Sequence, residues 1–395
     1  MVHRTDRILD NIPVGALGMI SLPGCEEMGN RVNDYLVKWR KETNHEHKDN
    51  IVFSGYENDT YLINAKVPRF GSGEAKGIIE ESVRGKDLYL MVDVCNYSLT
   101  YSLSGNTNHM SPDDHFQNLK RIIAAVGGKA RRLNVIMPFL YESRQHKRSA
   151  RESLDCALAL QELVRMGVDN IITFDAHDPR VQNAIPLSGF ETVRPTYQFI
   201  KGLLRSFDDL QLDSEHLMAI SPDEGATGRA IYFANVLGID MGMFYKRRDY
   251  TQVVNGRNPI VAHEFLGSSV EGKDVIILDD MISSGDSILD VAKQLKARKA
   301  KRIFAAATFG LFTNGMEKFD EAYEEGLIHG ILTTNLIYQT PELLSRPYYI
   351  NCDMSKYVAL LIDTLNHDGS ISSLLDPFDR IQAAVEAYKK GEPIE

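Results

Sequence analysis

The sequence predicts an α/β protein with two domains, each a mainly parallel sheet flanked by helices. From Leu133 onward, strand-like apolar runs alternate with segments that carry apolar residues at helical spacing. This alternation is typical of parallel sheets that are covered by helices. One apolar run in each half ends in an acidic motif, Asp175-Ala-His177 in the first half and Asp279-Asp280 in the second. We therefore expect one domain over residues 1–187 and a similar domain over residues 188–395.

The individual elements follow from the same periodicities, because apolar runs predict strands and apolar residues three or four apart predict helices. The expected strands are residues 17–22, 88–94, 135–140, 170–174, 217–220, 241–245, 275–278 and 302–308. The expected helices are residues 26–40, 112–126, 152–166, 196–206, 227–237 and the terminal 376–390. Residues 51–53, 61–67 and 75–81 alternate in part and indicate a short antiparallel piece.

Composition limits the class of protein. The 395 residues are 43% hydrophobic and 25% charged, as in an ordinary globular protein. A net charge of −10 argues against a nucleic-acid partner. The N-terminus lacks the apolar core of a signal peptide, and no apolar run approaches the ~20 residues that a membrane span needs. The four cysteines are widely separated, which indicates reduced thiols. We expect a cytoplasmic protein without nucleic-acid or membrane partners.

One stretch has the pattern of a ligand site. The apolar residues 275–278 predict a strand buried on both faces, and Asp279 and Asp280 follow where that strand should end. A short Ser/Gly loop, residues 283–287, comes next and leads into an amphipathic helix. In parallel sheets, ligands bind at the carboxyl ends of the strands.

The chemistry of this stretch suits a phosphorylated sugar. Backbone N–H groups of the loop and the N-terminus of the helix favour an anion. The hydroxyls of Ser284 and Ser287 add donors, and Asp279 and Asp280 can accept hydrogen bonds from sugar hydroxyls. The structural alternative is an ordinary βα turn with a serine cap.

A second cluster, His45 and His47, lies in a polar stretch that favours a solvated loop over a metal site.

Several motifs follow one another along the chain. They are Phe70-Gly-Ser-Gly-Glu74, Ile79-Glu-Glu-Ser-Val-Arg-Gly85, Pro138-Phe-Leu-Tyr-Glu-Ser-Arg-Gln145, Asp175-Ala-His177, Ser221-Pro-Asp-Glu-Gly225, Lys246-Arg-Arg248 and the stretch from Asp279 to Ser287. Each motif by itself would be weak, but in this order they resemble those of the ribose-phosphate pyrophosphokinases. The resemblance runs from about Leu17 to Leu375.

The resemblance implies two phosphoribosyltransferase-type (type I) domains and a magnesium-dependent transfer. The diphosphoryl group of ATP would move to the anomeric hydroxyl of ribose 5-phosphate, which gives phosphoribosyl pyrophosphate and AMP. The implied roles are ATP binding by Phe70, Glu74, Arg144 and Gln145, ribose-5-phosphate binding by Asp279, Asp280, Ser283, Ser284, Gly285 and Ser287, catalysis by Lys246 and Arg248, and Mg²⁺ binding by His177 and Asp223. The family also implies a homo-oligomer, in which Phe70 and Glu74 can act across a subunit interface.

Elementary chemistry agrees with these roles. Phosphoryl transfer depends mostly on positioning and on cations that stabilise charge on the phosphoryl oxygens. Lys246 and Arg248 follow directly after an expected strand and are suitable cations. Magnesium prefers oxygen ligands and keeps bound water, so a lone His177 and Asp223 would need substrate phosphates to complete the shell.

Several positions depart from the family pattern. Ser72 stands where an Asp is usual, His146 where an Asp often follows Arg-Gln, and Asp286 where the phosphate loop usually has Gly. Ser283 replaces an Asp that is common in bacterial members. Residues 96–114 form a longer, polar and turn-rich connection than usual, and the C-terminal helix extends past the usual end.

Two alternatives stay open at this point. Ser72 and Asp286 motivate a catalytically poor regulatory subunit that assembles with an active synthetase, although the retained Lys246, Arg248, His177 and Asp223 argue against it. The other alternative is a phosphoribosyltransferase, which needs only one such domain and a base-binding hood. Two domains and an Arg-Gln ATP segment do not suit that alternative.

Overall fold

The computed structural model describes residues 12–42, 55–248 and 260–394, except for the side chains of residues 246–248 and 260–263. The chain forms two compact units. Unit 1 comprises Met1–Arg194, Asn335–Tyr338 and Asp353–Asp376, and unit 2 comprises Pro195–Thr334, Gln339–Cys352 and Pro377–Glu395. This division differs from the expected one at residue 187, because it falls after Arg194 and because two later segments return to unit 1.

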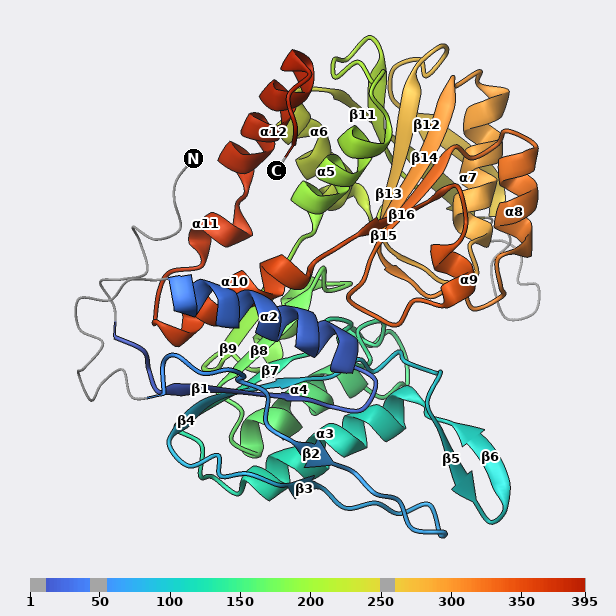
Figure 1. The fold of residues 1–395 in the computed structure, drawn as a ribbon. Helices are drawn as coiled ribbons and strands as arrows, with labels where there is room; N and C mark the ends of the chain where they lie inside the picture. The colour runs from blue at the N-terminus through green and yellow to red at the C-terminus, as the bar shows by residue number, and fades with distance from the viewer. Residues whose placement is uncertain (1–11, 43–54, 249–259, 395) are drawn as a thin grey trace. The chain divides into compact units, whose positions relative to one another are not determined.

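Unit 1 is built on a parallel sheet with helices on both faces (Figure 1). The strand order is β1 (Ala16–Ser21), β4 (Lys86–Met91), β7 (Arg132–Ile136), β8 (Asn170–Phe174) and β9 (Gly189–Val193). Helices α3 (Pro112–Val126) and α4 (Asp155–Arg165) cover one face, and α2 (Glu26–Glu42) and α10 (Ser355–Asn366) cover the other. Because its strands are buried on both faces, they have the nearly continuous apolar runs seen in the sequence.

Two small antiparallel pairs accompany this sheet. The expected antiparallel piece is confirmed in β2 (Ala65–Lys66) and β3 (Ile78–Ile79). The 96–114 connection contains a hairpin that was not expected, β5 (Thr100–Leu103) with β6 (Asn106–His109). A short 3₁₀ helix, Pro179–Ala184, follows β8.

The return of residues 353–376 to unit 1 is fixed by a buried ion pair. Arg40 of α2 is only 1% exposed, and its guanidinium bonds Asp363 of α10 at 3.2 Å and Asn366 at 2.7 Å. The same guanidinium lies 4.5 Å from the ring centroid of Tyr56. Removing one partner of such a pair would leave a buried charge without compensation. Helix α10 is therefore an integral part of unit 1.

Unit 2 contains a larger sheet with one antiparallel edge. Its order is β12 (Ile260–Leu266), β11 (Asp240–Arg248), β10 (Leu217–Ser221), β13 (Asp274–Ile282), β14 (Arg302–Gly310), β15 (Gly330–Thr334) and β16 (Tyr349–Cys352). Strand β12 pairs antiparallel with β11, and the other neighbours pair in parallel.

Successive residues of β13 pack into different cores, as expected for a strand buried on both faces. Val275 and Ile277 pack with α7 (Asp286–Ala297) and α8 (Glu317–Glu324). Ile276 and Leu278 pack with α5 (Thr196–Ser206), α6 (Thr227–Leu237) and α12 (Phe378–Lys390). The expected terminal helix is thus α12, which covers α5 and α6; Tyr388 on it donates its hydroxyl to the Phe207 carbonyl at 2.8 Å.

The elements expected up to residue 308 are present in the described part of the chain, apart from residues 51–53, which lie outside it. The strand expected at 135–140 is shifted, because β7 starts at Arg132 and ends at Ile136. Besides β5 and β6, the sequence did not predict β9, β12, α8, β15, β16, α9 (Pro341–Leu344), α10 or α11 (Ser372–Leu375). None of the described helices is both long and apolar enough to cross a lipid bilayer.

Candidate active site

The predicted sugar-phosphate cradle lies at the carboxyl ends of β10 and β13. These strands pair in parallel, with Ile220 opposite Ile277, so their following loops start at the same edge of the sheet. Strand β13 does not end before the acidic pair as expected. Asp279 stays opposite Ala307 of β14, and the pairing continues to Ile282. The acidic pair therefore lies on the strand, and the 283–287 loop begins directly after it.

Gly285 is the residue at which this loop turns into α7. Its φ of 84° lies in the left-handed region that favours glycine. A Cβ at this position would clash with the buried ring of Phe319 on α8. The backbone is thus packed directly against an aromatic ring, and the loop leads straight into the N-terminus of a twelve-residue helix. This geometry suits an anion such as a sugar phosphate.

The acidic pair has a perturbed electrostatic environment. Burial and the neighbouring Asp280 carboxylate raise the pKa of Asp279 well above its usual value. The backbone N–H of Asp280 donates to Asp279 Oδ1 at 2.9 Å, and Arg229 of α6 places Nη2 3.9 Å from Asp280 Oδ2. Asp279 therefore holds its proton to a higher pH than an isolated carboxyl group, and the pair can offer both a donor and an acceptor. Arg229 was not predicted; its only sequence signal was a basic residue shortly after Gly225.

Asp223 belongs to the same acidic cluster. Its Oδ1 accepts the backbone N–H groups of Gly225 at 2.9 Å and Ala226 at 3.2 Å, which holds the loop between β10 and α6. The charge of Asp223 also contributes to the raised pKa of Asp279. The fold therefore brings the predicted metal-binding Asp223 close to the predicted sugar-binding residues.

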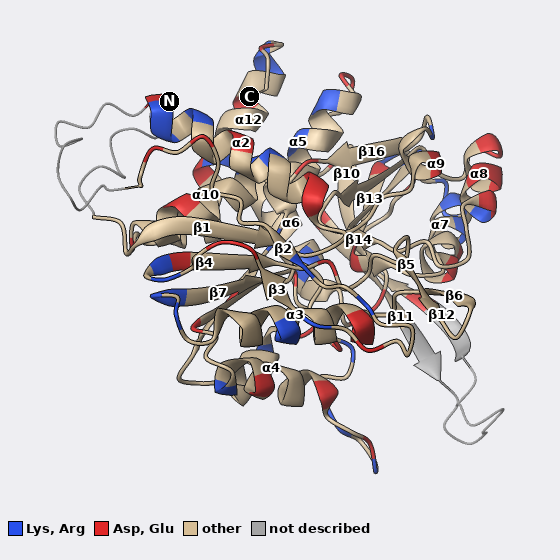
Figure 2. Cartoon of the chain, turned by 60° about the horizontal axis from the view of Figure 1, so that its bottom comes forward, with Lys and Arg blue, Asp and Glu red and all other residues tan. Residues whose placement is uncertain are grey.

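Asp286, the least expected residue of the loop, has a basic partner on α8. Lys318 Nζ lies 2.6 Å from Asp286 Oδ1, and the Ser284 hydroxyl donates to Oδ2 at 3.0 Å. The hydrogen bond from Lys318 is the main reason why the pKa of Asp286 is lowered. Figure 2 shows acidic and basic residues together on α7 and α8. The carboxylate is therefore compensated, but it engages the Ser284 hydroxyl that the resemblance gives to ribose 5-phosphate.

In unit 1, His177 follows the turn that ends β8. Asp175 has a φ of 40°, which is uncommon for a residue other than glycine. Its N–H donates to the Val193 carbonyl at 2.8 Å, and the N–H of Ala176 donates to Thr192 Oγ1 at 3.0 Å. These two bonds to β9 hold the strained turn and so determine where His177 leaves the sheet.

His146, which replaces an Asp often found in the family, lies beside His177. The two ring centroids are 5.3 Å apart, and His146 Nε2 is 3.6 Å from Asp178 Oδ2. Arg180 is the main cause that lowers the pKa of Asp178 to about 2, so this carboxylate is ionised at neutral pH. The segment after β7 and the segment after β8 thus meet at one edge of the unit 1 sheet.

Arg144 and Gln145 differ in their surroundings. Arg144 is exposed, whereas Gln145 is half-buried. The Gln145 side-chain amide donates to the Ser153 carbonyl at 2.8 Å. Arg144 therefore faces solvent, whereas that amide would have to leave Ser153 before it could donate to a ligand.

Residues 70–74 form a compact turn that its own backbone closes. The Phe70 N–H donates to the Glu74 carbonyl at 2.8 Å, and the Gly73 N–H donates to the Phe70 carbonyl at 2.9 Å. The Phe70 side chain is 52% exposed. Ser72 donates its hydroxyl to Glu74 Oε2 at 3.0 Å. Ser72 therefore supports Glu74 instead of supplying the carboxylate acceptor that the family pattern has at this position.

Lys246 and Arg248 lie at the end of β11, where the backbone is described but the side chains are not. Lys246 is opposite His263, and Arg248 is opposite Ile260 after a register shift. Their catalytic roles stay predictions. His45 and His47 fall in residues 43–54, which lie outside the described part of the chain.

The predicted metal ligands belong to different units, His177 to unit 1 and Asp223 to unit 2. Within residues 12–42, 55–248 and 260–394, no three His, Cys, Asp or Glu side chains gather into a preformed metal site.

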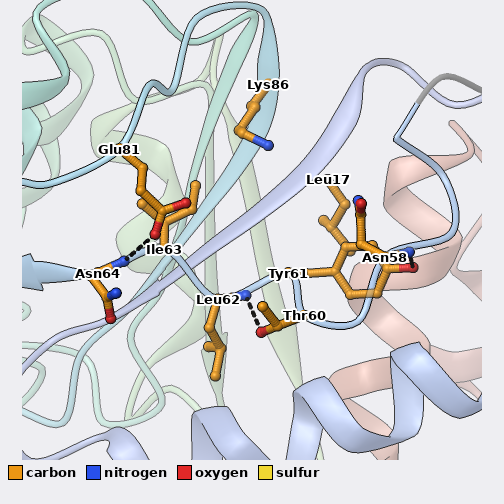
Figure 3. A pocket seen from close by; sticks show the side chains of 9 residues that line it. All are labelled: Leu17, Asn58, Thr60, Tyr61, Leu62, Ile63, Asn64, Glu81 and Lys86. Carbon is orange, nitrogen blue, oxygen red and sulfur yellow. Dashed lines mark hydrogen bonds between the residues drawn. The ribbon is translucent and has the colours of Figure 1, made fainter.

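Unit 1 also contains a cavity of about 320 Å³ away from these residues (Figure 3). Leu17 is near the start of β1 and Lys86 begins β4, so the cavity lies toward the amino ends of these strands. In Figure 3 the Glu81 carboxylate accepts the Asn64 N–H. The residues around it are Leu17, Asn58, Thr60, Tyr61, Leu62, Ile63, Asn64, Glu81 and Lys86, and none of them is a predicted site residue.

Comparison with known proteins decides the family. A family model described as the N-terminal domain of ribose phosphate pyrophosphokinase matches residues 17–167. A second, described as a phosphoribosyl synthetase-associated domain, matches residues 252–376. The chain belongs to the ribose-phosphate pyrophosphokinase family. The predicted class, a transferase of nucleotide biosynthesis, is confirmed by the same matches.

Relatives and a solved structure agree with this family. The ribose-phosphate pyrophosphokinase of Vibrio parahaemolyticus is 29% identical over 319 residues, which cover 80% of this chain and 92% of the relative. The ribose-phosphate pyrophosphokinase of Mycoplasma genitalium is 29% identical over 272 residues, which cover 68% of this chain and 74% of the relative. The phosphoribosylpyrophosphate synthetase structure from Mycobacterium smegmatis covers 89% of this chain and 99% of its own, with 20% identity and a TM-score of 0.70. The predicted fold of two phosphoribosyltransferase-type domains is confirmed.

Proposed function

We propose that this chain transfers the diphosphoryl group of ATP to ribose 5-phosphate and releases AMP. The observation that carries the proposal is the strand, acidic pair, Ser/Gly loop and helix of unit 2, in a member of this family. In the reaction, the anomeric oxygen forms a bond to the β-phosphorus and loses its proton. The bond between the β-phosphorus and the oxygen that bridges to the α-phosphorus breaks, and AMP leaves with that oxygen.

At the sugar end, the proposal gives the 5-phosphate to the 283–287 loop. Backbone N–H groups of Gly285 and its neighbours, together with the hydroxyls of Ser283, Ser284 and Ser287, would hold the phosphate. Asp279 and Asp280 would bind the ribose hydroxyls. Support for this role comes from the raised pKa of Asp279, since a protonated carboxyl donates where an ionised one accepts.

At the nucleotide end, Phe70 and Glu74 would contact adenine, and Arg144 and Gln145 would bind ATP. Lys246 and Arg248 would stabilise negative charge on the transferred group. The exposure of Phe70 and Arg144 supports these roles, because both side chains face solvent where a ligand can reach them. Arg is suited to phosphate oxygens because its guanidinium is planar and always charged.

Mg²⁺ is proposed as the metal. The two residues fit Mg²⁺ only in part. The Asp223 carboxylate accepts two backbone hydrogen bonds, both at Oδ1. His177 would provide a nitrogen ligand, which Mg²⁺ favours less than oxygen. When bound, the ion would supply positive charge against the ATP phosphates. Asp223 and His177, each after a strand of its own unit, stay the residues proposed to provide ligands.

A homo-oligomeric assembly and a cytoplasmic location also stay proposals. Both departures that motivated a regulatory subunit have local partners, Lys318 for Asp286 and Glu74 for Ser72. These contacts support the active enzyme over the regulatory alternative. Light scattering of the purified chain would give the oligomer size.

The test is AMP release by the purified chain, measured with a coupled assay. The proposal expects AMP formation that requires both ribose 5-phosphate and Mg²⁺ and that falls at least a hundredfold in Lys246→Ala. AMP release that ignores ribose 5-phosphate would exclude the proposal. Activity only after mixing with a second synthetase would support the regulatory subunit, and nucleotide formation from a nucleobase and phosphoribosyl pyrophosphate would support the phosphoribosyltransferase.

A further inference from the structure

The β5–β6 hairpin of the 96–114 connection lies against the 70–74 turn. Its Ser104 N–H donates to the Gly71 carbonyl at 3.3 Å. A Cβ on Gly73 would lie 2.9 Å from Cδ1 of Leu103, so the Leu103 side chain packs directly on the backbone of the turn. Along β5, Tyr101 and Leu103 are half-buried, whereas Thr100 and Ser102 are exposed. One face of the strand is therefore used to cover the turn.

Arg69 connects the turn, the hairpin and α3. Its guanidinium lies 4.0 Å from the ring centroid of Tyr101 and donates to the Gly73 carbonyl at 2.9 Å. It also forms an ion pair with Asp114 at 3.1 Å, and the side chain is only 11% exposed. A partly buried cation is attracted by the face of an aromatic ring, and burial strengthens this attraction. Arg69 is therefore oriented by groups from three segments.

Asp114 fixes this arrangement to the body of unit 1. It caps α3 by accepting the Ser111 N–H at 3.0 Å, and it accepts the Tyr101 hydroxyl at 3.4 Å. Burial opposes its ionisation, but the bond from Ser111 and the charge of Arg69 outweigh it and lower the pKa of Asp114. The carboxylate is thus charged at neutral pH and holds Arg69 and Tyr101 together.

The base of the hairpin is anchored as well. The Asn96 side-chain amide donates to the Gly24 carbonyl at 3.0 Å, and the buried His115 Nε2 lies 2.8 Å from the Asn96 carbonyl. The Met110 N–H donates to the Leu99 carbonyl at 2.8 Å. Because the hairpin is held at its base, its contacts with the 70–74 turn can restrict the motion of that turn.

We infer that the β5–β6 hairpin is a positioning element for the 70–74 turn and sets the affinity for the nucleotide. The turn contains two glycines, Gly71 and Gly73, and its Phe70 ring is largely exposed, so without support it would sample many conformations. Contacts from Tyr101, Leu103 and Ser104 order it before a ligand arrives, which reduces the entropy lost on binding. This inference rests on the proposed function, because it takes adenine as the ligand of Phe70 and Glu74.

Three variants test the inference against one matched control. Tyr101→Leu removes the ring over Arg69, and Leu103→Ser removes the packing on Gly73. Replacing residues 101–108 by Asn-Gly joins the paired Thr100 and His109 through a two-residue turn and removes the hairpin. Ser102→Ala changes the exposed face of the same strand and serves as the control.

The first measurement is hydrogen exchange over residues 68–75 in the protein without ligands. We expect faster exchange in the three variants and no change in Ser102→Ala. Unchanged exchange in all three would overturn the inference, whatever the enzyme catalyses.

The second measurement compares kinetic constants. We expect the KM for ATP to rise about tenfold in Tyr101→Leu, while kcat and the KM for ribose 5-phosphate stay within twofold of the unmodified protein. A merely structural defect would lower kcat and raise both KM values, which would overturn the positioning role. Calorimetry with MgATP separates the two proposals: ATP binding weakened by the variants, without any product, would overturn the proposed function and support the inference, whereas no ATP binding at all would overturn the inference.

Discussion

The 283–287 loop and the 70–74 turn, proposed to hold the two substrates, obtain their shapes in different ways. The loop is continuous with β13 and α7, and Gly285 packs on Phe319 within the same unit. The turn is closed by its own backbone bonds, but it packs against a hairpin that comes later in the chain. A site built from consecutive elements is visible in the local sequence pattern, whereas a site held by a distant segment is not.

The largest expected effect comes from breaking the loop at Gly285. Gly285→Ala adds a left-handed strain of about 1–2 kcal/mol and a clash with Phe319 of about 1–3 kcal/mol. We expect the free energy of unfolding of unit 2 to fall by about 3 kcal/mol and the KM for ribose 5-phosphate to rise more than tenfold. Urea unfolding and initial rates measure both.

Gly272→Ala is the matched control for that change. Gly272 has a φ of 76°, but nothing lies within 4 Å of a Cβ placed there. Gly272→Ala should lower the free energy of unfolding by the backbone strain alone, about 1–2 kcal/mol, and leave the KM for ribose 5-phosphate unchanged. Equal losses of stability in both variants would mean that the packing on Phe319 does not shape the loop.

The second effect concerns Asp93, which anchors the start of the hairpin segment. This buried carboxyl group accepts the N–H of Cys95 at 2.8 Å and of Tyr338 at 2.7 Å, and burial raises its pKa to about 7. Because the pKa is higher in the folded state than the usual 3.8, the proton stabilises the fold below about pH 4. This contribution is lost as the pH rises from about 4 to 7.

Asp93→Asn removes that titration. Relative to the unmodified protein, the free energy of unfolding of the variant should rise by about 2–3 kcal/mol between pH 5 and pH 8, on top of a constant loss from the changed hydrogen bonds. Urea midpoints across this range check the slope. Parallel pH profiles of the two proteins would contradict the account of Asp93.

A smaller effect is expected for the exposed aromatic ring of the turn. Phe70→Ala should raise the KM for ATP about tenfold, as expected for the loss of one aromatic contact, and leave unfolding unchanged because the ring is 52% exposed. Phe378→Ala, at the start of α12, removes a ring of similar exposure, 47%, and should change neither quantity. A loss of stability without a change in KM would remove Phe70 from the nucleotide site.

The smallest effect should come from the charge at Asp286. Asp286→Gly removes a carboxylate near the phosphate loop and should lower the KM for ribose 5-phosphate by about threefold, and at most tenfold. Lys318→Met leaves that carboxylate without its basic partner and should shift the KM in the opposite direction. Both shifts should shrink in 0.5 M salt, because the two side chains are exposed. A large loss of activity in Asp286→Gly would reveal a positive role for this residue.

Sequence reasoning predicted the fold where burial was visible along the chain. Strands such as β10 and β13 have continuous apolar runs because helices cover both of their faces. It missed β5 and β6 because residues 100–109 are largely polar, and it missed the return of α10 to unit 1 because Arg40 and Asp363 are 323 positions apart. No local pattern reports such a pairing.

The same limit applies to the candidate site. The acidic pair and the phosphate loop lie within nine consecutive residues, so their spacing alone predicted a cradle. The partners that modify it, Arg229 and Lys318, come from other helices, where a basic residue alone does not indicate which carboxylate it contacts. His146 was noticed only as a departure, and its place beside His177 became visible in the structure.

The most direct test of the central proposal is phosphorus NMR of the purified chain with ATP, ribose 5-phosphate and MgCl₂. The account predicts that the ATP signals disappear while AMP and a sugar-linked diphosphate appear in equal amounts. The appearance of ADP, or an unchanged spectrum at high enzyme concentration, would contradict a diphosphoryl transfer by this chain.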